Sequence, residues 1–72
     1  MSARELARSL AAQGFTVRAA GLMLILIETQ PSAENLTLLA EIYAQQGLFT
    51  DAAALYLRVL IQGGSDGVPT PE

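Results

Sequence analysis

The sequence repeats itself with a period of 33 residues. When it is shifted by that amount, residues 6–28 lie over residues 39–61, and nine of the 23 paired positions are identical. The coinciding residues are mostly alanine and leucine, with a glycine at 14 and again at 47. A fixed period in this range is typical of repeat architectures, in which each helical unit buries its apolar face against the next. The pattern predicts an all-α chain of two similar helical hairpins.

Capping and turn residues divide the chain into four expected helices, at about residues 3–13, 17–30, 33–46 and 51–62. Short polar residues stand where the helices should begin, glycines where the first and third should end, and a proline between the second and third. These residues are Ser2, Thr16, Ser32 and Thr50, then Gly14 and Gly47, then Pro31. The connections at the two glycines span three or four residues, which favours antiparallel neighbours.

The last ten residues differ in composition from the rest. Residues 63–72 contain three glycines and two prolines around a single apolar residue, Val68. Such a segment cannot bury enough apolar surface to offset the entropy of ordering it. We therefore expect a helical domain over residues 1–62 and a flexible tail over residues 63–72.

The second hairpin resembles a repeat of the tetratricopeptide (TPR) family, whose signature places small and large residues at fixed offsets on a helix pair. The matching residues are Leu36, Leu39, Ala40, Tyr43, Gly47, Phe49, Ala52 and Tyr56. The first hairpin is a weaker copy, in which Leu6, Ala7, Gly14, Ala19 and Pro31 fit. The resemblance implies two tandem TPR-like hairpins, over about residues 1–32 and 33–62, with four antiparallel helices in a right-handed α-solenoid.

The packing expected inside each hairpin follows from residue size. Ala7 against Ala19, and Ala40 against Ala52, would let paired helices approach to about 8 Å, because a methyl is the largest group between them. Leu6, Leu10, Leu39 and Tyr43 on the first helices, and Ala52, Tyr56, Val59 and Leu60 on the last, are expected to form the apolar seams. We also expect the four aromatic residues, Phe15, Tyr43, Phe49 and Tyr56, to pack inside or between the hairpins.

The composition argues against catalysis and metal binding. The chain has no cysteine and no histidine, which removes the usual nucleophile, the usual general base and the commonest transition-metal ligands. We therefore expect no catalytic residue, no metal, no cofactor, no small-molecule substrate and no enzymatic activity. Four arginines without a lysine are too few for a nucleic-acid surface. The apolar run at residues 19–27 is too short to span a bilayer, and we expect a cytoplasmic protein.

The TPR resemblance implies a groove along the first helix of each hairpin, where that family holds peptides or partner helices. The corresponding residues are Arg4, Arg8, Ala11, Thr37, Glu41, Ala44 and Gln45. The two arginines would suit an acidic peptide or a C-terminal carboxylate. Leu38 stands where the carboxylate-clamp adaptors of the family have an asparagine, however, so a solvated helix face is the simpler interpretation.

Apolar residues on the outer faces suggest a different surface. Leu22, Leu24 and Ile25 on the second helix, and Ala53, Leu57 and Ile61 on the fourth, are candidate oligomer contacts. Burial between the first and third helices is the alternative for the second helix, although it accounts for one side only. The leading hypothesis is a small TPR scaffold or adaptor that forms a homo-oligomer, specifically a homodimer. A chaperone or cochaperone that holds a client in the groove, and a fragment or regulatory subunit of a larger assembly, are the other hypotheses.

Overall fold

The structure is a computed structural model that describes the backbone of residues 1–65 and the side chains of residues 1–62. It contains α1 (Ala3–Ala12), α2 (Thr16–Thr29), α3 (Ala33–Gln45) and α4 (Phe49–Ser65), and no strand within residues 1–65. The all-α class is confirmed. The fourth helix continues past its expected end at Gln62, because glycine lowers helix stability by about 1 kcal/mol without forbidding the helix. The rest of the predicted tail, residues 66–72, lies outside the described residues.

Serine side chains start α1 and α3 as predicted. The Ser2 hydroxyl accepts a hydrogen bond from the Glu5 amide at 3.1 Å, and the Glu5 carboxylate accepts one from the Ser2 amide at 2.9 Å. This capping box satisfies two backbone donors that the first turn leaves unpaired. The Ser32 hydroxyl accepts from the Asn35 amide in the same way, at 3.1 Å.

The predicted threonine caps of α2 and α4 are wrong. Phe15 is the N-cap residue of α2 and gives no side-chain hydrogen bond, while Thr16 is already helical. Thr50 likewise lies within the first turn of α4, which begins at Phe49. In the first turn the residue directly after Gly14 is the cap, so the helix begins one residue earlier than the threonine cap required.

The two glycine turns have the same hydrogen-bond pattern. Gly14 and Gly47 have φ angles of +92° and +84°, which favour glycine. The amide of the following residue donates to a carbonyl of the preceding helix, from Phe15 to Leu10 at 2.9 Å and from Leu48 to Tyr43 at 2.8 Å. Both turns are therefore Schellman motifs, 33 residues apart. The sequence period is thus present in the backbone as well.

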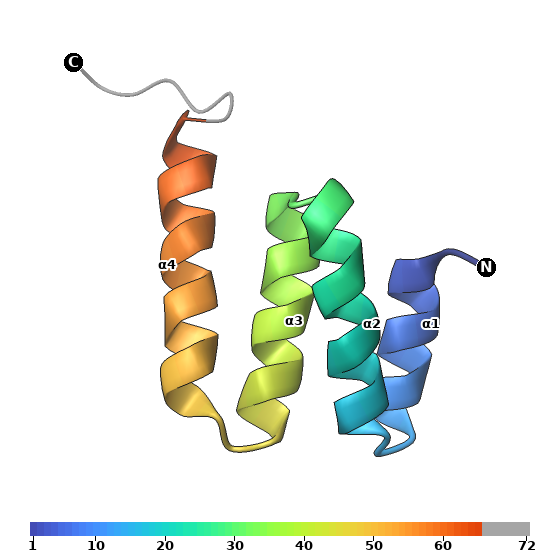
Figure 1. Ribbon diagram of the computed structural model, residues 1–72. Helices are drawn as coiled ribbons and strands as arrows, with labels where there is room; N and C mark the ends of the chain where they lie inside the picture. Colours follow the sequence, from blue (N-terminus) through green and yellow to red (C-terminus); the bar gives the residue numbers. More distant parts are fainter. Residues whose placement is uncertain (66–72) are drawn as a thin grey trace.

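The helices stand side by side in chain order, and each packs on the next (Figure 1). The α1–α2 and α3–α4 turns lie at one end of the molecule and the α2–α3 connection at the other. α3 also touches α1, whereas α3 is the only one of the described helices that α4 packs against. The side chains buried in the core are Ala7, Ala11, Ala19, Ala20, Met23, Leu36, Leu38, Leu39, Ala40, Ile42, Ala52 and Leu55.

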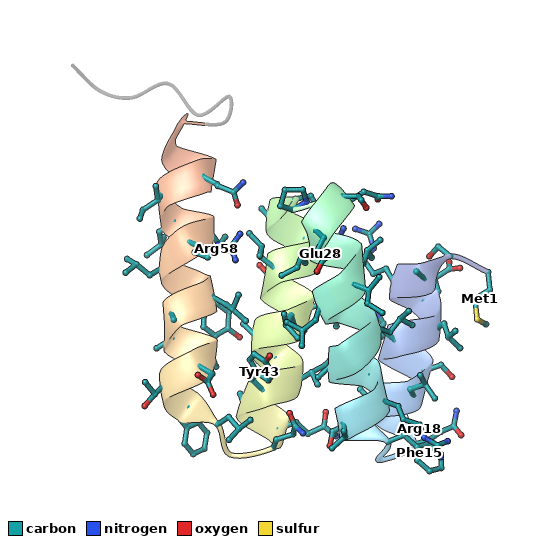
Figure 2. All side chains as sticks on the ribbon, in the orientation of Figure 1. Met1, Phe15, Arg18, Glu28, Tyr43 and Arg58 are labelled. Carbon is teal, nitrogen blue, oxygen red and sulfur yellow. The ribbon has the colours of Figure 1, made fainter. Side chains whose placement is uncertain are left out.

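The alanines expected between paired helices are buried, but most aromatic side chains are not. Tyr43 is half-buried against the core, whereas Phe15, Phe49 and Tyr56 are exposed, so the expected aromatic packing is wrong for three of four. Phe15 lies beside the first glycine turn, where the Arg18 guanidinium stands 5.3 Å from its ring centroid (Figure 2). Leu6 and Leu60, two residues expected in the seams, are also exposed.

The glycine geometry predicts opposite effects for two alanine substitutions. Gly47→Ala should destabilise the fold by about 1–2 kcal/mol, because an L-residue is strained at that positive φ. Gly21→Ala should stabilise it by about 0.5–1 kcal/mol, because Gly21 lies inside α2 and an added methyl meets no atom within 4 Å. Urea unfolding followed by circular dichroism measures both. A Gly47→Ala variant as stable as the parent would contradict the assigned turn.

Candidate interaction surfaces

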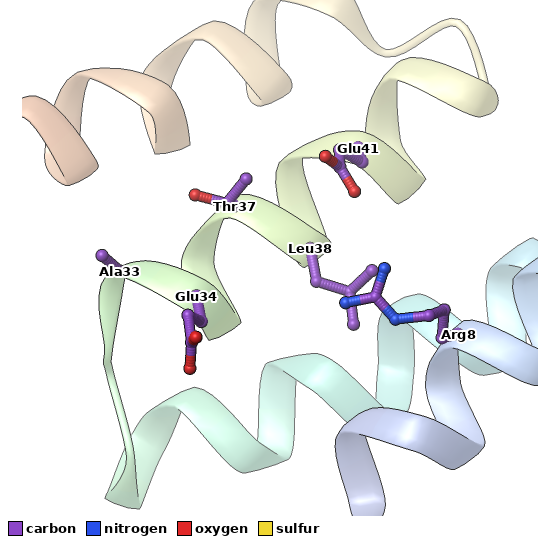
Figure 3. A pocket seen from close by; sticks show the side chains of 6 residues that line it. All are labelled: Arg8, Ala33, Glu34, Thr37, Leu38 and Glu41. Carbon is purple, nitrogen blue, oxygen red and sulfur yellow. The ribbon is translucent and has the colours of Figure 1, made fainter.

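A shallow hollow lies between α1 and α3, where the groove residues were expected. It has a volume of about 280 Å³ and is lined by Arg8 of α1 and by Ala33, Glu34, Thr37, Leu38 and Glu41 of α3 (Figure 3). Three of the predicted groove residues, Arg8, Thr37 and Glu41, therefore line one hollow. Two carboxylates accompany the single arginine, which makes this surface less favourable for an acidic ligand than two arginines alone.

Arg4 is engaged by the protein itself. Its guanidinium donates from Nη1 to Oε1 of Glu34 at 2.6 Å and is 3.5 Å from Oδ1 of Asn35. Both members of the ion pair are at least partly exposed, so the pair contributes no more than about 1 kcal/mol to stability. An external carboxylate that bound Arg4 would compete with Glu34 for the same nitrogen.

The remaining groove candidates join helices to one another. The side chain of Gln45 donates from Nε2 to the carbonyl of Ala11 at 3.0 Å and so ties α3 to the last turn of α1. Ala11 itself is buried, and Ala44 packs half-buried against the core. These three residues connect the helices and lie outside the hollow.

Asn35 is a buried polar residue that the sequence analysis did not single out. Its side chain is 3% exposed, and its Nδ2 donates to the carbonyl of Gln30, the C-cap residue of α2, at 2.8 Å. Its Oδ1 faces Arg4, and its backbone amide is bonded to Ser32. Asn35 therefore joins the start of α3 to the end of α2 and to α1. Its position three residues after the serine cap, in the first turn of α3, is the one signal in the sequence that could have drawn attention to it.

The second candidate surface is apolar and spread over α2 and α4. Leu24 and Ile25, which we call the α2 patch, are exposed as predicted, and so are Ala53, Leu57 and Ile61 on α4. Leu22 differs from that prediction, because it is half-buried and packs against the core. Its position on α2 is turned toward the neighbouring helices rather than outward.

Three further exposed residues of α4 were assigned to the apolar packing in the sequence analysis. Phe49, Tyr56 and Leu60 are 69%, 40% and 72% exposed. Together with Ala53 they recur at spacings of four, three and four residues, which places them along one side of the helix. We call these four residues the α4 stripe. The 33-residue register could have identified the stripe. It pairs Ala53, Tyr56 and Leu60 with residues of α2 that are buried or half-buried.

The described residues hold no group of three or more acidic side chains that could bind a metal ion. Within the described helices, none is long and apolar enough to cross a bilayer. No family model, curated protein or solved structure matches the chain.

Asn35→Ala should destabilise the fold by about 1–3 kcal/mol, because it removes the hydrogen bond that the buried Asn35 side chain donates to the carbonyl of Gln30. Arg4→Ala is the matched control, since it keeps the Asn35–Gln30 bond and removes the exposed ion pair and the long 3.5 Å contact with Asn35; it should cost about 1 kcal/mol or less. Chemical denaturation of the two variants and the parent measures the difference. Equal losses would show that Asn35 does not join the helices as described.

Proposed function

We propose that this chain is a protein-interaction module of the TPR type, a small homo-oligomeric scaffold or adaptor without chemistry of its own. In this proposal the helices form two tandem antiparallel hairpins stacked as a right-handed solenoid, and the protein acts in the cytoplasm. The two matching Schellman turns and the packing of successive helices support the repeat arrangement.

The observation that carries the proposal is the exposure of large apolar side chains on α2 and α4. In the α2 patch, Ile25 is 68% exposed. The α4 stripe adds two exposed aromatic residues and an exposed leucine. Charged residues are only 15% of the chain, against about 25% in typical domains, so few charges separate these apolar surfaces. Contiguous apolar surface of this kind on a folded domain marks protein contact.

The distribution of acidic groups supports a module without catalysis. Glu28, Glu34, Glu41 and Asp51 are all exposed. Glu34 is paired with Arg4, and Asp51 lies in the first turn of α4, where a carboxylate favours the positive end of the helix dipole. Each of these two carboxylates has a structural reason for its position.

Self-association tests the proposal. Sedimentation velocity of the chain over micromolar concentrations should show a homodimer, because burying the apolar side chains of a second copy removes them from water. Dilution should shift the distribution toward the monomer by mass action. A stable, compact monomer over the whole range would contradict the homo-oligomeric function.

A second candidate function is supported by the hollow between α1 and α3. A chaperone or cochaperone would hold a client peptide or helix there, with Arg8 as the anchor and Leu38 as apolar floor. The exposed apolar residues of α2 and α4 would then extend the client surface.

Titration with peptides separates this candidate from the first. Amphipathic and acidic peptides should shift the amide NMR signals of α1 and α3, and Arg8→Ala should weaken binding of the acidic peptide about tenfold, the loss of one charged contact. Val17→Ala, on exposed α2 surface outside the hollow, is the control. Shifts confined to α4, or none, would exclude the hollow as the client site.

A further inference from the structure

α2 and α4 occupy equivalent places in the repeat but have different numbers of neighbours. α2 packs against both α1 and α3, whereas α3 is the one described helix on which α4 packs. The 33-residue register matches Ala20, Met23 and Ile27 of α2 to Ala53, Tyr56 and Leu60 of α4. The α2 residues are buried or half-buried, and Met23 is 0% exposed, whereas their α4 counterparts are exposed. The α4 stripe is therefore the counterpart of an α2 face that adjoining helices cover.

The outer surface of α1 does not suit this stripe. The exposed residues of α1 other than Arg8, which lines the hollow, are Glu5, Leu6 and Ala12. If α1 of a second copy stacked on α4 through them, the Glu5 carboxylate would lose its water against an apolar stripe that offers it no partner. Such a head-to-tail contact would also leave an unsatisfied surface at each end of a dimer, and would be completed only in a ring or an open filament. The two ends of the helix row are thus mismatched.

We propose that the α4 stripe docks against the same stripe of a second copy, with the two α4 helices antiparallel about a two-fold axis. This inference rests on the proposed function and names the partner and the contact. The spacing of the stripe, four, three and four residues, is the same in both chain directions. An axis at the level of the Ala54–Leu55 peptide places Phe49 opposite Leu60 of the partner subunit, and Ala53 opposite Tyr56 of the partner subunit. A small residue then faces a large one at the centre, as interdigitated packing needs.

The exposed area of the α4 stripe approaches what a two-fold dimer interface requires. The stripe and the adjacent Leu57 expose on the order of 600 Å² of largely apolar surface, against about 800 Å² per partner in a standard stable interface. The stripe contains no charged residue, so its burial leaves no unpaired charge. A two-fold contact closes on itself and stops at the dimer.

A pair of matched glutamate variants tests the surface. Leu60→Glu places a carboxylate in the stripe, and Ile25→Glu places one in the α2 patch at similar exposure, 72% and 68%. Leu60→Glu should weaken the dimer at least about 100-fold in sedimentation velocity, because each interface would bury two unpaired carboxylates. Val17→Glu, at 74% exposure on α2 outside both apolar surfaces, is the control and should leave the dissociation constant unchanged. Ile25→Glu tests the α2 patch as the competing contact and should have no effect if the dimer forms through α4. All three side chains are exposed in the single chain, so circular dichroism should show all three variants folded.

Variants with one introduced cysteine test the relative orientation of the two α4 helices, because the parent sequence contains no cysteine. In the antiparallel pair the two copies of residue 53 lie about 4.5 Å apart along the helix axis, and those of residue 49 about 16 Å apart. With helix axes about 8–10 Å apart and Cα atoms about 2.3 Å from each axis, the two Cα atoms of residue 53 would lie about 5.6–7.0 Å apart. Ala53→Cys should therefore form an intersubunit disulfide under mild oxidation, since bridged Cα atoms lie about 4.4–6.8 Å apart, and Phe49→Cys should not. Equal crosslinking of the two variants would indicate parallel helices and overturn the antiparallel arrangement.

The outcomes separate this inference from the proposed function. A dimer that Ile25→Glu disrupts and Leu60→Glu leaves intact overturns the α4 contact, while self-association stands. A parent chain that remains monomeric overturns both. A dimer that only Leu60→Glu disrupts supports both.

Discussion

The close approach of paired helices at buried alanines is the contact on which the rest of the structure depends. Ala7, Ala19, Ala40 and Ala52 are nearly or fully buried, and a larger side chain at any of them would push two helices apart. The glycine turns support this approach, because each Schellman turn joins its two helices through only three residues and keeps them adjacent. Small buried side chains and a glycine turn therefore favour the same close pairing of helices, once for α1 and α2 and again for α3 and α4.

A row of helices built in this way has two ends, and the ends of this row differ. α1 is amphipathic, with Ala7 and Ala11 buried and Glu5 and Arg8 exposed. α4 repeats the two apolar faces of an internal helix, although one of them has no helix against it among the described residues. The exposed stripe therefore follows from the 33-residue repeat. α4 has apolar residues at the positions that, in α2, adjoining helices cover.

The sequence predicted the four helices because their ends depend on local chemistry, namely the serine caps, the glycines and Pro31. It misplaced the starts of α2 and α4, because a threonine is compatible both with a cap and with the first turn of a helix, and here Thr16 and Thr50 are helical. It found Ile25 and Leu57 as exposed apolar residues but assigned Phe49 and Tyr56 to packing within or between hairpins, because aromatic type predicts burial without indicating which helix provides it. The burial of Asn35 was beyond prediction for a similar reason: it depends on how α1, α2 and α3 meet.

The two candidate surfaces lie on different parts of the row, and this separation bears on how they would work together. None of the six residues that line the hollow belongs to α4, and none of the four stripe residues belongs to α1 or α3. A dimer joined through α4 would therefore leave one hollow open on each copy. Two weak sites held at a fixed separation bind a two-armed or repeated ligand far more tightly than either site alone, because the second contact becomes intramolecular. A hollow of about 280 Å³ with mixed charges suits modest affinity, so under the proposed function pairing through α4 would be the step that gives useful avidity.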